Sequence, residues 1–191
     1  MAACRYRMPT EANINFTSAV LVHSNLGGTG GDPTLPPTML FGSVGVNPAT
    51  GRSYDLEISN LSAYDPWNPT KNGMSGDFGQ VNLEVPHVGE GLNLTYVDLR
   101  FDFKDSLTSE PVTLDHIFIT FFDFDYGSNR NGVECISTTR FDSYLVTSET
   151  EIWGDYDTRS DPDDPDAIFQ FFCAGTEGNG QDNPTDPLAL T

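Results

Sequence analysis

The feature that most limits how this chain can fold is an alternation of apolar and polar residues with a period of two. The longest example, residues 96–104, reads YVDLRFDFK, and every second residue is apolar: Val97, Leu99, Phe101 and Phe103. Residues 54–59, YDLEIS, and 80–85, QVNLEV, alternate in the same way. Successive side chains of a strand point to opposite faces, so each segment predicts a strand with one buried and one wet face.

Residues 112–125, VTLDHIFITFFDFD, break this pattern because both phases are apolar beyond His116. A β-branched and aromatic run bounded by Pro111 and Gly127 predicts a strand buried on both faces, at the centre of a sheet. Turn residues separate several further segments with strand-like composition, which predict additional strands: 13–24, 38–44, 132–138, 141–146 and 167–172.

The order of these segments indicates the fold class. With 18 Gly and 13 Pro the chain is rich in turn formers, and no segment has a helical apolar stripe with caps. Short strands without intervening helices predict an all-β protein, an antiparallel β-sandwich of jelly-roll type. We expect one domain over residues 1–173 and a linker or disordered tail over 174–191, with turn-rich loops at 25–38, 63–79 and 154–167.

The net charge excludes some partners. The chain has 28 acidic and nine basic residues and a formal charge of -19, so its field repels phosphate backbones and anionic lipid headgroups. We therefore expect no nucleic-acid partner. No apolar run approaches the roughly 20 residues of a membrane-spanning helix, so we expect no membrane insertion. We also expect no targeting segment within this chain, because its first 16 residues have no signal-type apolar region.

The loop after the phenylalanine-rich segment predicts a cation site. Residues 121–134, FFDFDYGSNRNGVE, contain five carboxylate or amide side chains: Asp123, Asp125, Asn129, Asn131 and Glu134. Calcium takes about six to eight oxygen ligands, and Gly127 and Gly132 allow the tight backbone path that such a site needs. The spacing does not match an EF-hand. We predict calcium as the ion, and a solvated turn and a catalytic carboxylate pair remain as alternatives.

A second acidic segment, residues 154–167, carries six aspartates, of which Asp155 and Asp157 are the first candidate cation ligands. Their mutual repulsion favours weak divalent binding where cations are abundant, as they are outside the cell, and plain solvation is the alternative. Two tryptophans supply candidate ligand-binding positions. Trp67 with Tyr64 and Asn68, and also Trp153, combine an aromatic ring with polar neighbours, as sugar-binding sites do; closing an end of the core is the alternative role.

The cysteines and the absence of known catalytic motifs limit the classes of function that the sequence supports. Cys135 and Cys173 lie in predicted strands and either pair as a disulfide or remain two buried thiols. The sequence has no CxxC pair, no G-x-S-x-G nucleophile elbow, no H-E-x-x-H zinc motif and no P-loop. We therefore expect a protein without enzymatic activity.

Residues 111–152 resemble β-sandwich modules of microbial and algal surface proteins. The resemblance rests on TLDHIFITFFDFD, then a Gly/Asn loop, the short strand VECI, and the spaced residues of FDSYL and TSETEI. It implies a sandwich with a cation-stabilised loop at Asp123 and Asp125. Many such loops carry a further aspartate where this chain has Gly127.

Together these patterns predict a calcium-stabilised β-sandwich that works as a binding or adhesion module, with a glycan or another protein as its partner. We expect it outside the cell, at the cell surface or in an organelle lumen. One alternative is a structural subunit that assembles into a homo-oligomer or polymer, such as a coat, sheet or filament. The other is a polysaccharide hydrolase or lyase, which needs only two suitably spaced acids.

Overall fold

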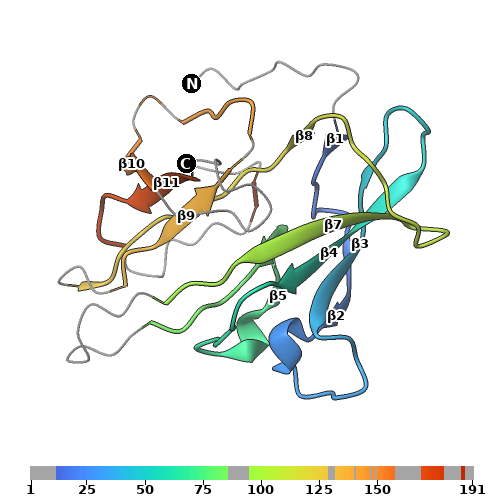
Figure 1. Ribbon diagram of the computed structural model, residues 1–191, viewed down its shortest axis with the longest axis horizontal. Coiled ribbons are helices and arrows are strands. Elements are labelled where there is room, and N and C mark those ends of the chain that lie inside the picture. The colour runs from blue at the N-terminus through green and yellow to red at the C-terminus, as the bar shows by residue number, and fades with distance from the viewer. Residues whose placement is uncertain are drawn as a thin grey trace. The chain divides into compact units, whose positions relative to one another are not determined.

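The computed structural model describes residues 12–85, 95–128, 132–139, 141–146, 148, 150–157, 169–178 and 186–187, without the side chains of 155–157. In these residues the chain is all-β with almost no helix, as the sequence predicts (Figure 1). The strands have these bounds: β1 Ala12–Asn13, β2 Val20–Ser24, β3 Thr38–Val46, β4 Ser53–Asn60, β5 Gly73–Ser75, β6 Phe78–Gln80, β7 Leu99–Asp105, β8 Ile117–Phe118, β9 Cys135–Thr138, β10 Ile152–Asp157 and β11 Phe169–Ala174. Two short 3-10 turns, η1 Leu26–Gly28 and η2 Pro69–Lys71, complete the set.

The described residues fall into two compact units. Unit 1 contains residues 12–85, 95–121 and 186–187, and unit 2 contains the described residues between 122 and 178. The predicted domain boundary after residue 173 stays a prediction. None of the described helical segments has the length and apolarity that a membrane-spanning helix needs.

Unit 1 is built on an antiparallel sheet with the strand order β2-β3-β4-β7. The alternation in residues 54–59 is confirmed, because Tyr54, Leu56 and Ile58 are buried and the residues between them are not. In β7 the apolar residues Leu99, Phe101 and Phe103 are partly buried and pack against the core. Residues from several elements make up this core: Ala12, Leu26, Met39, Phe41, Val44, Tyr54, Leu56 and Ile58.

An irregularity in the pairing of β3 leaves room for the Tyr54 side chain in this core. The pairing of β3 with β4 shifts between Phe41 and Gly45. The Tyr54 side chain is fully buried, and its hydroxyl donates a hydrogen bond to the main-chain oxygen of Asn13 at 2.7 Å. A Cβ atom on Gly45 would lie 2.2 Å from the Tyr54 hydroxyl oxygen, so only glycine leaves room for the buried ring.

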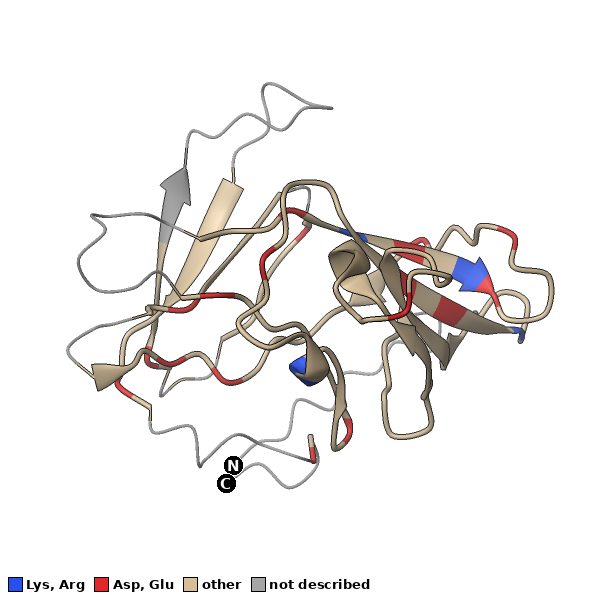
Figure 2. Ribbon diagram, turned by 90° about the horizontal axis from the view of Figure 1, so that it is seen from below, with Lys and Arg blue, Asp and Glu red and all other residues tan. Residues whose placement is uncertain are grey.

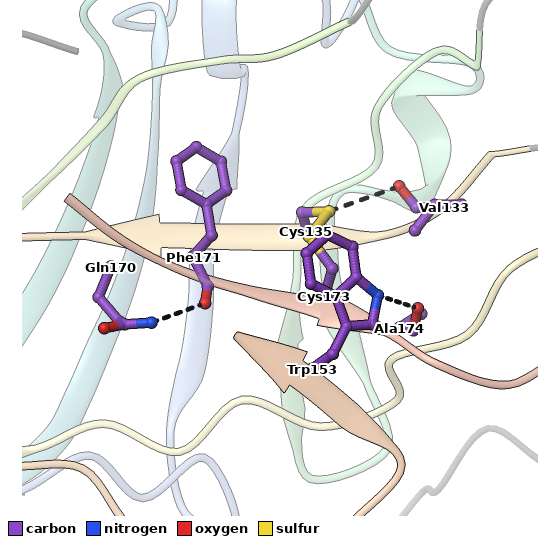
Figure 3. Close-up of a disulfide and its surroundings, with 7 residues drawn as sticks. All are labelled: Val133, Cys135, Trp153, Gln170, Phe171, Cys173 and Ala174. Atoms are coloured by element: carbon purple, nitrogen blue, oxygen red, sulfur yellow. Dashed lines mark hydrogen bonds between the residues drawn. A yellow bond between two sulfur atoms is a disulfide. The ribbon is translucent and has the colours of Figure 1, made fainter. Parts of the chain in front are cut away.

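Unit 2 contains an antiparallel sheet with the strand order β10-β11-β9. Cys173 in β11 lies directly opposite Cys135 in β9, and the two form a disulfide (Figure 3). Of the two alternatives that the sequence left open, the structure has the paired cysteines.

The prediction of a central buried strand over residues 112–125 is wrong. Only β8 forms there, and it pairs in parallel with the two residues of β1. Three apolar residues of the segment 112–125 are substantially exposed: Phe118, Ile119 and Phe121. Apolar residues in both alternating positions indicate that a segment tends to be buried. A central strand also needs a partner on each edge, and among the described residues no further strand pairs with the segment 112–125.

Three other expectations also fail. Residues 81–85 form no strand, because the main chain of Asn82 and Glu84 bonds instead to the loop before β5. Residues 141–146 form no strand. Residues 152–157 form β10 although the sequence predicted a loop from residue 154, because six consecutive residues pair with β11.

Candidate functional site

In the predicted cation loop of unit 2, the charges of two aspartates act on Glu134. The main-chain N–H of Glu134 donates to the main-chain oxygen of Asp125 at 3.2 Å, which places the two ends of the loop side by side. Asp123 adopts a φ of 63°, a left-handed conformation that aspartate tolerates better than most residues. Burial, followed by the negative charges of Asp125 and Asp123, raises the pKa of Glu134 to about 7.

A later segment of unit 2 closes over this loop. Tyr126 donates its main-chain N–H to Thr176 at 3.1 Å, and the N–H of Gly178 donates to Tyr126 at 3.2 Å. The Asp125 carboxylate lies so close to Gly178 that a Cβ atom there would be 1.8 Å from Asp125 Oδ2. Glycine at position 178 is therefore required for the carboxylate to occupy its place.

The fit of this loop to a metal ion is partial. Within the described part of the chain, no three His, Cys, Asp or Glu side chains are grouped closely enough to hold a metal ion. Two predicted ligands, Asn129 and Asn131, lie outside the described residues, and so do the side chains of Asp155 and Asp157.

The chemistry of the donor set nevertheless has a clear consequence. Asp123, Asp125 and Glu134 repel one another when all three are ionised, and this repulsion is relieved either by a proton on Glu134 or by a bound cation.

The three residues of the first aromatic candidate, Trp67, Tyr64 and Asn68, have different roles in the structure. Trp67 is 62% exposed. The Tyr64 hydroxyl, in contrast, contacts Asn72 Oδ1 at 2.9 Å and donates to the main-chain oxygen of Asn82, and burial raises the pKa of Tyr64. The Asn68 side chain caps η2 by accepting the Thr70 N–H at 3.0 Å. Tyr64 and Asn68 therefore hold the loop in place. Trp67 is the one of the three residues that the loop exposes to solvent.

The second aromatic candidate lies beside the disulfide. Trp153 in β10 is directly opposite Cys173, and its indole N–H donates to the main-chain oxygen of Ala174 at 3.0 Å (Figure 3). The ring is held in one orientation along β11, and Trp153 is still 52% exposed. An anchored, exposed indole presents a flat apolar surface to a ligand at little entropic cost.

An aromatic cluster that the sequence did not predict lies on the opposite face of this sheet. Tyr144 packs edge-on against Phe172 of β11, with ring centroids 4.9 Å apart, and Phe141 packs against Tyr144 at 6.0 Å. Leu145 and Val146 next to it are exposed. The aromatic and β-branched composition of residues 141–146 was the available signal, and it predicted a strand instead.

A polar network crosses the wet face of the unit 1 sheet, where acidic and basic residues share strands (Figure 2). The His23 ring nitrogen Nε2 lies 2.9 Å from Thr38 Oγ1, whose hydroxyl is 3.5 Å from Glu57 Oε1. Lys104 Nζ contacts Glu57 Oε2 at 2.5 Å. This pairing follows the interleaved charges of the sequence. The polar residues of this face therefore have a structural role, because they pair with one another across strands.

Comparisons with protein-family models, with curated proteins and with solved structures give no match for this chain.

Proposed function

We propose that this protein is a non-enzymatic binding or adhesion module, a β-sandwich stabilised by calcium at the loop of Asp123, Asp125 and Glu134. The observation that carries the calcium proposal is the environment of Glu134, where burial and then the negative charges of Asp125 and Asp123 raise the pKa of Glu134 to about 7. A divalent ion offsets the repulsion among these charges and takes oxygen ligands from carboxylates and main chain. The ion would then hold the loop in the conformation that supports the neighbouring sheet.

The disulfide between Cys135 and Cys173 supports a location outside the cell, at its surface or in an organelle lumen. Disulfides form and persist in oxidising compartments, where free calcium is also abundant. The two exposed tryptophans, Trp67 and Trp153, support a glycan as the ligand, because an indole stacks on the apolar face of a sugar ring.

A second candidate is a structural subunit that assembles with copies of itself. The observation in its favour is the edge strand β2, where Val20 and Val22 are 63% and 57% exposed. An exposed apolar edge strand is a template for pairing with another chain. Sedimentation of the protein with and without calcium separates the two candidates, because a monomer at high concentration contradicts assembly.

The calcium proposal is tested by melting the protein with calcium and with a chelator. We expect chelation to lower the Tm, because a ligand that binds only the folded state stabilises it by mass action. The double variant Asp123→Ala/Asp125→Ala should lose this dependence. The matched control is Asp98→Ala/Asp102→Ala, which removes two acids from unit 1 and should keep the wild-type response. A chelator response that survives in the loop variant would place the ion elsewhere.

The glycan proposal is tested on an immobilised glycan array. Binding that is lost in Trp67→Ala or Trp153→Ala would support it, and an array without any bound glycan would contradict it. Melting curves of both variants provide the control for folding.

A further inference from the structure

Two loops at one end of the unit 1 sheet enclose a pocket that the sequence did not predict. One loop, residues 47–52, joins β3 to β4, and the other, residues 105–113, follows β7. The pocket between them has a volume of about 480 Å³ and is open to solvent. Most of the residues that line it have polar or charged side chains, among them Thr50, Arg52, Asp105, Thr108, Glu110 and Thr113.

Both loops are held rigidly by their own hydrogen bonds. In the first, the Asn47 N–H donates to the Arg52 oxygen at 2.9 Å and the Gly51 N–H donates to the Asn47 oxygen at 2.8 Å. In the second, the Asp105 N–H donates to the Glu110 oxygen at 2.8 Å. A salt bridge of 2.7 Å between Arg52 and Asp105 Oδ1 ties the two loops together. The pocket is therefore preformed, which lowers the entropic cost of binding.

The Asp105 carboxylate is used on one side only. Its Oδ1 accepts the N–H groups of Leu107 and Thr108, each at 3.0 Å, together with Arg52 and the Thr108 hydroxyl. Among the described residues, no hydrogen bond reaches the other oxygen, Oδ2, although the side chain is only 10% exposed. Oδ2 is not among the buried side-chain atoms that lack a partner, so it keeps contact with solvent in the open pocket, where a ligand hydroxyl can replace water as its donor.

Asp105 remains ionised in this setting. Burial alone would raise the pKa of Asp105, but the N–H groups of Thr108 and Leu107, the Arg52 charge and the Thr108 hydroxyl lower it below its ordinary value. Arg52 beside the carboxylate opposes a metal cation, and Glu110 with the overall charge of -19 opposes an anion.

We propose that this pocket binds a neutral polyhydroxylated ligand, namely a sugar unit of a glycan, with Asp105 Oδ2 accepting a ligand hydroxyl and Arg52 donating to another. Thr50 and Thr113 also line the pocket, and a threonine hydroxyl can both donate and accept a hydrogen bond, as the hydroxyl groups of a sugar can. The ligand class rests on the proposed glycan-binding function, and the site is separate from the two tryptophans.

The test uses nuclear magnetic resonance of the full chain titrated with glucose, galactose and mannose at millimolar concentration. We expect shifts centred on residues 47–52 and 105–113. Asp105→Asn keeps the Oδ1 acceptor and turns Oδ2 into a donor, so it should weaken binding about tenfold or more. Thr113→Val, which removes one hydroxyl at nearly constant shape, should also weaken binding. Asp102→Asn, an acid on β7 outside the pocket lining, is the matched control and should bind as the wild type does.

The outcomes distinguish this pocket from the proposed function as a whole. Glycan-array binding with no sugar-induced shift at the pocket, or with shifts that Asp105→Asn leaves unchanged, overturns the pocket and keeps the function. An array without binding, together with pocket shifts that Asp105→Asn removes, keeps the pocket as a sugar site and overturns the tryptophan sites. If the array shows no binding and the sugars cause no shifts at the pocket, both the pocket and the proposed glycan-binding function are overturned. If Asp105→Asn melts at a lower temperature, Thr113→Val decides the question.

Discussion

Gly45 illustrates how one residue without a side chain governs the core of unit 1. The bulge that contains it turns β3 so that Tyr54 enters the core with its hydroxyl bonded to Asn13. The buried ring then occupies the space beside the Gly45 backbone. A change at this position acts on Tyr54 and Asn13 at once.

We expect Gly45→Ala to destabilise the protein by about 1–3 kcal/mol, because the new methyl group would overlap the Tyr54 hydroxyl and the Asn13 main chain. Gly42→Ala, on the same strand, meets no atom closer than Val22 Cγ2 at 3.4 Å and should change stability by no more than about 0.5 kcal/mol. Urea denaturation of both variants measures the difference. Equal effects would mean that strand propensity, and not the contact with Tyr54, governs the cost.

Glu134 predicts a dependence of stability on pH. Its pKa of about 7 in the folded chain lies above the ordinary 4.5, so the folded state binds more protons between these values. The stabilisation is complete below the ordinary pKa and is lost as pH rises through about 7. We therefore expect the Tm in chelator to fall between about pH 5 and about pH 8. Because Glu134 is exposed at the surface, screening by water keeps this effect modest.

Glu134→Gln provides the control, since it removes the titrating group and keeps the shape. It should flatten the pH profile, and calcium should raise the wild-type Tm more at the higher pH, where Asp123, Asp125 and Glu134 are all charged. A profile unchanged by the substitution would assign the pH dependence to other groups.

At the level of elements, the disulfide is the main covalent constraint on unit 2. It joins β9 to β11 across 38 residues of sequence that include β10. The loop that it closes is therefore most of the unit, and opening it restores considerable freedom to the unfolded chain.

We expect Cys135→Ser/Cys173→Ser to destabilise unit 2 by about 4 kcal/mol. The two tryptophans report on the units separately, because Trp67 lies in unit 1 and Trp153 in unit 2. Fluorescence-monitored urea denaturation in a Trp67→Phe background should show the loss, and a Trp153→Phe background should show unit 1 unchanged. Equal losses in both backgrounds would instead indicate that the units unfold as the single domain that the sequence predicts.

For the whole molecule, the net charge of -19 is the property with the widest effect. Such self-repulsion disfavours the compact state at low ionic strength. Raising the salt from about 0.01 M to about 0.15 M shortens the screening length from roughly 30 Å to roughly 8 Å, so we expect the Tm to rise. Calcium compared with sodium at equal ionic strength separates specific binding from screening. A Tm that falls with salt would mean that attractive pairs, such as Lys104 with Glu57, outweigh the repulsion.

The sequence alone determined the strands whose pattern is local. In residues 54–59 and 99–104 the alternation identifies both the strand and its buried face, because side-chain direction in a strand is a property of the backbone itself. The all-β class follows from the same local patterns. The acidic loop was also visible, since Asp123, Asp125 and Glu134 lie within a dozen residues of one another.

Only the tertiary structure decided which segments pair and which distant groups meet. Within the apolar segment 112–125 only Ile117 and Phe118 pair with a strand, whereas 152–157 form a six-residue strand because β11 lies beside them. Arg52 and Asp105 form their pocket from 53 residues apart in sequence. Pairing and approach depend on how loops close and what the rest of the chain offers, and a residue's own chemistry contains neither.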